Sequence, residues 1–136
     1  MKKILLKEAE KHRDTVPAKL CNCLYDVCNN VLFKATTPVM FCVHMNMLFE
    51  DSFFIPRRNK GVHICFMVFM VEQQIPDEDH AIEWSTLFIE RCDIKDKYYK
   101  SHRSDDLRSD SSRSVEFRED IENAIKTWKA MGLAPR

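Results

Sequence analysis

The chain has 136 residues, 45% of them apolar, and a formal net charge of zero. This length predicts a single domain (1–136) with a buried core, and the charge balance excludes a strongly basic or acidic molecule as a whole. Glycine is scarce, with only Gly61 and Gly132 in the chain. Phosphate-binding loops, dinucleotide fingerprints and nucleophile elbows each need several glycines, so nucleotide-dependent chemistry by these routes is not expected.

Residues 1–14 are expected to form an N-terminal arm or a short helix. Lysine and glutamate at 7–11 interrupt any apolar signal sequence. No uncharged apolar run reaches the length that a membrane span needs, so no membrane association is expected. We therefore expect a cytoplasmic or nuclear protein, in which the six cysteines stay free thiols.

The clearest helix prediction covers Pro17–Ala35. Apolar residues recur there every three or four positions and form one broad stripe. Asp14 or Thr15 can cap its start, and the sequence Thr36-Thr37-Pro38 is expected to end it because the residue before proline avoids the helical region.

The apolar stretch Val39–Val71 predicts a three-stranded antiparallel meander. In 39–49 the polar residues His44 and Asn46 are two apart, which is the period of a strand with one buried face. The run 62–71 is rich in β-branched and aromatic residues. A short strand at 53–55 would join them. A buried helix at 39–49 is the alternative, because short apolar runs fit both structures.

Two more helices are expected after the meander. One begins near Pro76-Asp77-Glu78-Asp79, where acidic residues suit a helix start, and runs to about Cys92. The other covers Val115–Met131, with Gly132 suited to its C-terminal cap. Between them, the Ser/Arg/Asp-rich stretch 100–114 is expected to be a mobile loop. The predicted fold is α+β, in the order α-β-β-β-α-α, with three helices covering the sheet.

Two Cys/His pairs give the most specific site hypothesis, although the spacing of the ligands is not that of a common zinc finger and the required register leaves 47–60 as a long loop. On strands, residues two apart share a face, so each pair would present a thiol and an imidazole together. If the two strands pair in register, four zinc ligands converge, namely Cys42, His44, His63 and Cys65. Core cysteines and hydrogen-bonded histidines explain the same residues without metal. We therefore expect no cofactor, with zinc at these four residues as the alternative.

The other ionisable clusters are weaker candidates. Cys21, Cys23 and Cys28 do not converge if they lie on a helix, since Cys23 is turned about 200° from Cys21. The imidazole of His80 follows three acidic residues, which suits acid–base chemistry or Mg²⁺, but a surface helix start explains it equally well.

Basic and serine residues suggest two further roles. Nucleic-acid phosphates could be contacted by Lys2, Lys3, Arg57, Arg58 and Lys60. Arginine-serine dipeptides recur every five residues, so Ser104, Ser109 and Ser114 are candidate phosphorylation sites that could order the loop.

Our leading expectation is a non-enzymatic, regulatory protein-binding module whose partner is another protein or a second copy. Methionine and phenylalanine are dense in 39–71, as at adaptable interfaces. Self-association is also suggested by charge: residues 1–68 carry ten basic and six acidic side chains, and residues 69–136 carry eleven and fifteen. The alternatives are a nucleic-acid-binding module, and an enzyme with a Cys/His or acid–base site.

Overall fold

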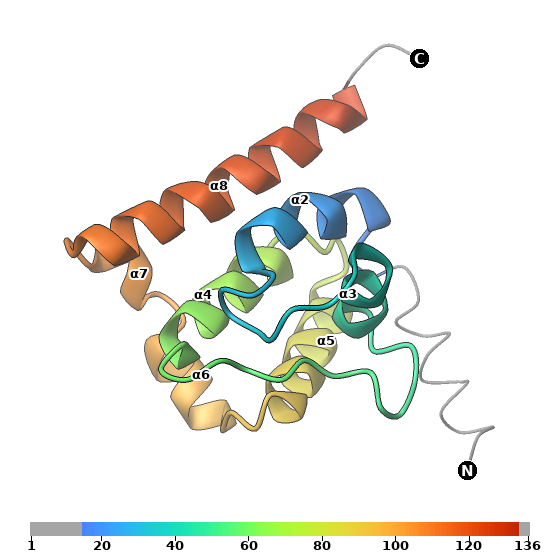
Figure 1. Cartoon of the computed structure of the whole chain (residues 1–136), viewed down its shortest axis with the longest axis horizontal. Coiled ribbons are helices and arrows are strands. Elements are labelled where there is room, and N and C mark those ends of the chain that lie inside the picture. The colour runs from blue at the N-terminus through green and yellow to red at the C-terminus, as the bar shows by residue number, and fades with distance from the viewer. Residues whose placement is uncertain (1–14, 134–136) are drawn as a thin grey trace.

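The computed structural model describes residues 15–133, and this part of the chain is helical (Figure 1). Its β structure is limited to two isolated bridges, one between Asn29 and Phe33 and one between Phe33 and Pro56. The predicted α+β fold with a three-stranded meander is therefore wrong. The helices are α2 (Ala18–Cys28), α3 (Pro38–Met45), α4 (Gly61–Glu72), α5 (Glu78–Arg91), α6 (Asp96–His102), α7 (Asp105–Arg108) and α8 (Ser112–Leu133).

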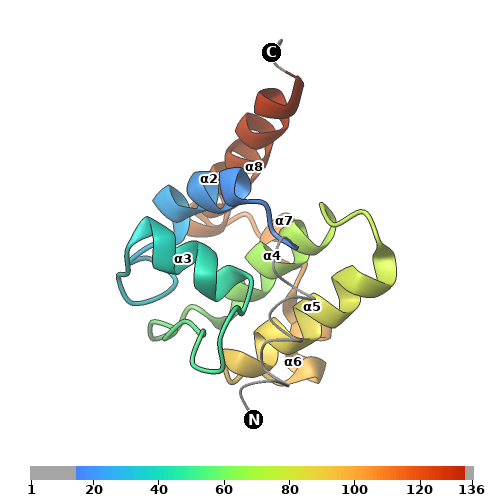
Figure 2. The same ribbon diagram turned by 90° about the vertical axis from the view of Figure 1, so that its right-hand side faces the viewer.

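Helix α4 lies in the middle of the molecule, with α5, α6, α7 and α8 packed around it (Figures 1 and 2). Half of its residues are buried, including the unbroken run from Ile64 to Val68, and none of the others is fully exposed. A helix that is covered on all sides needs no polar face, so its apolar residues show no helical period. This is why the run 62–71 reads as a strand in the sequence.

The helix that replaces the first predicted strand is α3. It begins at Thr37, whose side chain accepts a hydrogen bond from the amide of Met40 at 3.2 Å, and Pro38 occupies its first turn. Proline is favoured there because its missing N–H would have no partner within the helix. Thr37-Pro38 is thus the start of a helix, whereas the sequence reasoning took it as the end of one.

The first and last described helices lie side by side. Helix α2 ends at Cys28, earlier than the predicted Ala35, and Asn30 follows with a φ of 57°, which asparagine tolerates. Helix α8 confirms the predicted helix at 115–131. It crosses α2 and extends beyond it (Figure 1).

An extended segment, residues 46–60, connects α3 to α4. It turns beside α3 and then runs across the molecule to the start of α4 (Figure 1). Two hydrogen bonds tie it to 32–34, from Lys34 N to the Ile55 oxygen and from Arg57 N to the Leu32 oxygen, both 2.8 Å. The predicted strand at 53–55 is therefore an extended segment that pairs through one bridge.

The serine-rich stretch 100–114 contains helical residues that we predicted as loop. Helix α6 reaches His102, α7 covers Asp105–Arg108, and Ser111 precedes α8 with its hydroxyl accepting from the Ser114 amide at 3.2 Å. The predicted arm at 1–14 lies outside the described residues. None of the helices within 15–133 combines the length and the apolar character needed to cross a membrane.

Candidate functional site

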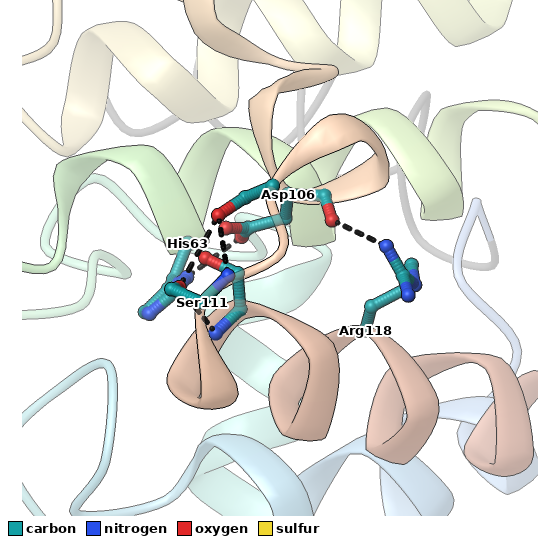
Figure 3. Close-up of polar contacts among 6 residues, drawn as sticks. His63, Asp106, Ser111 and Arg118 are labelled. Carbon is teal, nitrogen blue, oxygen red and sulfur yellow. Dashed lines mark hydrogen bonds and ion pairs between the residues drawn. The ribbon is translucent and has the colours of Figure 1, made fainter.

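The best-defined polar pair links α4 to α7. His63 Nδ1 donates to Asp106 Oδ2 at 2.6 Å, as drawn in Figure 3. The Asp106 side chain is 1% exposed and that of His63 is 18% exposed. The imidazole also packs on the Phe117 ring of α8, with ring centroids 4.6 Å apart. The pair therefore joins α4 and α7 beneath the first turns of α8.

An arginine of α8 fixes the backbone that carries Asp106. The guanidinium of Arg118 donates to the carbonyl oxygen of Asp106 (Figure 3) and to that of Leu107, both at 3.1 Å. These carbonyls belong to the four-residue helix α7, whose last carbonyls have no partner within the helix. Arg118 thus serves as a C-terminal cap for α7 and holds the aspartate in place.

His63 also lines a groove between α2 and α8. A cavity of about 540 Å³ lies at this point, and its polar walls carry both charges. A second cavity of about 480 Å³ adjoins it, because the two share Asp26, Val27 and Asp120. The residues of the first cavity that carry charge or a titratable ring are Asp26, Lys60, His63, Arg113, Glu116 and Asp120. Mixed charge gives this groove no clear preference for a ligand of one sign.

The structure does not bring the four predicted zinc ligands together. Cys42 and His44 lie on α3, whereas His63 and Cys65 lie on α4, and residues two apart on a helix face different sides. Within residues 15–133, His, Cys, Asp and Glu side chains form no group of three that could hold a metal ion. The premise of the zinc hypothesis was two strands, and both segments are helices.

His44 is instead a partly buried histidine beside an aromatic ring. Its ring lies 5.2 Å from that of Phe54, and its Nδ1 is a buried atom with no hydrogen-bond partner. Burial lowers the pKa of His44, and the opposing influence of Asp51 is smaller. The folded chain therefore binds a proton here less readily than the unfolded chain does.

This gives a prediction for acid stability. Below about pH 6.5, the unaltered value, the unfolded chain takes up a proton at His44 that the folded chain resists, so stability falls as the pH falls. Replacing His44 with phenylalanine removes this contribution. Urea unfolding at pH 7.5 and pH 5.5 should show a smaller acid loss in His44→Phe than in the native chain. An equal loss in both would contradict the assignment.

The predicted acid–base cluster at 77–80 forms the start of α5. Asp77 caps the helix by accepting from the His80 amide at 2.9 Å, and the His80 ring is hydrogen-bonded with the Thr15 hydroxyl at 2.6 Å.

Of the predicted phosphate-binding residues, Lys2 and Lys3 lie outside the described residues. Arg57 donates to the backbone oxygen of Asn30.

The candidate phosphorylation sites differ in their surroundings. Ser104 accepts from Arg108 at 2.8 Å, Ser109 hydrogen-bonds with Ser111 at 3.2 Å, and Ser114 is only 9% exposed within the first turn of α8. A kinase would have to unwind that turn to reach Ser114, whereas the other two lie nearer to solvent.

Sequence reasoning missed the exposed apolar side chains that α3 and the extended segment carry within residues 39–55. Phe54 points inward and is 3% exposed, and its two neighbours along the chain point outward. The signal was present in the sequence as the alternation Phe53-Phe54-Ile55, but it was assigned to a sheet. We call these residues the apolar strip: Val39 (73% exposed), Met40 (41%), Phe49 (55%), Phe53 (46%) and Ile55 (52%).

The turn at 49–52, which carries Phe49 and leads to Phe53, is fixed by a side chain of α5. Arg91 donates to the backbone oxygens of Phe49 and Ser52, at 2.9 and 2.8 Å, and the Ser52 hydroxyl accepts from the Phe49 amide. The exposed aromatic residues are therefore presented on an anchored turn, and binding through them would cost little ordering of the backbone.

Comparison with known proteins places the chain in no family. No protein-family model, no curated protein and no solved structure matches it.

Proposed function

We propose that this chain is a non-enzymatic protein-binding module, and that its apolar strip pairs with the apolar strip of a second copy. The observation that carries the proposal is the concentration of exposed apolar side chains within 39–55. Scattered single residues of this kind are normal on a protein surface, but a cluster with charged neighbours is typical of an interface.

Charge favours a second copy as the partner. Along the extended segment, Glu50 and Asp51 are exposed at the turn beside α3, whereas Arg57 and Arg58 are exposed at the end nearer α4. A two-fold axis through the apolar strip would place the acidic end of one copy against the basic end of the other. Such an interface is self-complementary, and the zero net charge means that the copies do not repel each other at long range.

The first test is the oligomeric state. Sedimentation velocity over a wide concentration range should show a reversible dimer for the native chain. Phe53→Asp places a charge in the centre of the strip and should weaken dimerisation at least tenfold, or by about 1.4 kcal/mol or more. Met131→Asp is the matched control, since Met131 is 44% exposed in the last turn of α8. It should dimerise like the native chain.

A charge exchange tests the arrangement of the two copies. Glu50→Arg alone and Arg58→Glu alone should each weaken the dimer, and the effect counts twice because each contact occurs twice across the two-fold axis. The chain with both changes should regain most of the lost affinity. If the losses add instead, the acidic and basic ends do not face each other.

Other outcomes would identify a different partner. A chain that is monomeric at every concentration would overturn pairing with a second copy. Salt-dependent binding of generic RNA or DNA that is lost in Arg58→Glu would favour the nucleic-acid alternative. Circular dichroism of each variant establishes that a loss of binding does not reflect unfolding.

A further inference from the structure

Two thiols from different helices meet at the packing of α2 against α3. Cys21, in the first turns of α2, is 0% exposed, and Cys42, in the middle of α3, is half-buried. The amide nitrogen of Asn46 contacts both sulfur atoms, Cys42 Sγ at 3.8 Å and Cys21 Sγ at 4.0 Å. One side chain therefore holds the two thiols beside each other.

The two thiols also interact electrostatically. Burial raises the pKa of the Cys21 thiol, and the neighbouring Cys42 raises it further through its charge and a side-chain hydrogen bond. Cys21 is therefore protonated and slow to react by itself. Cys42 differs because it reaches solvent, so an oxidant would meet Cys42 first.

We infer that Cys21 and Cys42 form an oxidation site, at which a peroxide converts the two thiols into a disulfide that joins α2 to α3. In the first step, Cys42 attacks the peroxide, the O–O bond breaks, and Cys42 becomes a sulfenic acid as one water leaves when the oxidant is hydrogen peroxide. In the second, Cys21 attacks the sulfenic sulfur, the S–S bond forms and a second water leaves. The two thiols together lose two electrons and two protons.

The other thiols make useful comparisons. Cys65 is close enough to Cys92 to help raise the pKa of its thiol, but both are buried, at 0% and 5% exposed, so no thiol of that pair meets an oxidant readily. Cys23 is half-buried like Cys42, but it lies on the other side of α2 from Cys21. Oxidation should therefore select the Cys21–Cys42 pair.

The experiment treats the full chain with a modest excess of hydrogen peroxide, blocks the remaining thiols, and maps the peptides by mass spectrometry without reduction. The expected product is one intramolecular Cys21–Cys42 disulfide in both the native chain and Cys23→Ser. Cys42→Ser should give no disulfide. The oxidised native chain should unfold at a temperature about 5–10 °C higher than the reduced one, because the link closes the loop between the two helices. Dithiothreitol should reverse the shift.

Several results would overturn the inference. A disulfide between two chains, an intramolecular link through any other cysteine, or sulfinic acid at Cys42 with Cys21 still a free thiol would each show that the two sulfurs do not react together. Cys42→Ser stays informative because Cys42 is half-buried and the change is small. These measurements can be made on a monomer, so they succeed or fail independently of the proposed dimer.

Discussion

Replacing His63 with phenylalanine is expected to destabilise the chain by about 3 kcal/mol. Phenylalanine fills the space of the imidazole and can still pack on Phe117, but it cannot donate to Asp106. A carboxylate that is 1% exposed is then left without its 2.6 Å donor, and removing one partner of a buried pair typically costs several kcal/mol. Urea unfolding of His63→Phe and of the native chain measures the difference.

The chain contains its own control for this prediction. His102 and Asp105 form a pair of nearly the same length, 2.7 Å, but each side chain is 40% exposed. Solvent screens such a pair, so His102→Phe should cost less than about 1 kcal/mol. If both substitutions cost the same, burial is not what makes the inner pair important.

A double variant tests whether the unpaired charge of Asp106 causes the loss of stability in His63→Phe. His63→Phe combined with Asp106→Leu removes the buried charge as well as its partner, and an apolar pair can replace a buried ionic pair at little cost. The double variant should therefore be more stable than His63→Phe alone. If it is less stable, the Asp106 side chain contributes through contacts other than its pairing with His63.

Replacing Asn46 with leucine is expected to cost about 3–4 kcal/mol, the second large effect. Asn46 is 1% exposed and binds both polar groups of the Val16 backbone, accepting from its N–H at 2.8 Å and donating to its oxygen at 3.0 Å. It also donates to the Cys42 oxygen at 3.2 Å. Leucine has nearly the same volume, but it leaves the buried Val16 N–H without an acceptor and removes the amide donor from the Val16 oxygen, at about 1–3 kcal/mol each.

Two further variants check the cause of the Asn46 effect. Asn22 is exposed on α2, and Asn22→Leu should change the free energy of unfolding by less than about 0.5 kcal/mol. Asn46→Asp keeps the acceptor for the Val16 N–H but loses the donor for the Val16 oxygen. Its change in the free energy of unfolding should therefore differ from that of Asn46→Leu. Equal losses for Asn46→Asp and Asn46→Leu would indicate that the donor accounts for the whole effect.

The helices with one apolar stripe were predictable from the sequence. The start of α5 was predicted to within a residue or two, because Asp77 is a capping residue followed by acidic residues. The last helix was also predicted, since its buried apolar residues recur every three or four positions, at Phe117, Ile121, Ala124 and Ile125. In these elements the local signal and the tertiary packing agree, as expected for helices with one buried and one exposed face.

The apolar centre was not predictable by the same reasoning. A fully buried helix such as α4 has no polar residues to mark its period, so a strand and a helix fit its sequence equally well. The helix that forms there has 12 residues, which is longer than a typical strand. The wrong strands then produced the wrong site, because the convergence of Cys42, His44, His63 and Cys65 depended on period-two geometry.

Asp106 shows a second limit of prediction from the sequence. It lies in a stretch of serine, arginine and aspartate that gives no sign of burial, yet it is among the most buried polar residues of the described chain. Its burial depends on His63, which is 43 residues away in the sequence, and on Arg118. The contacts that order this stretch are polar and join residues far apart in the sequence. A hydrophobic pattern does not predict such contacts.

The pairing of α2 with α8 has a consequence for how the molecule assembles. These helices are the most widely separated in the described chain, so bringing them together closes the longest loop and carries the largest entropic cost of any helix pair. Helices that are neighbours in the sequence, such as α4 and α5, can meet at much lower cost. We infer that the groove between α2 and α8 is among the last features to form during folding. The groove would then exist only in chains whose core around α4 is already complete.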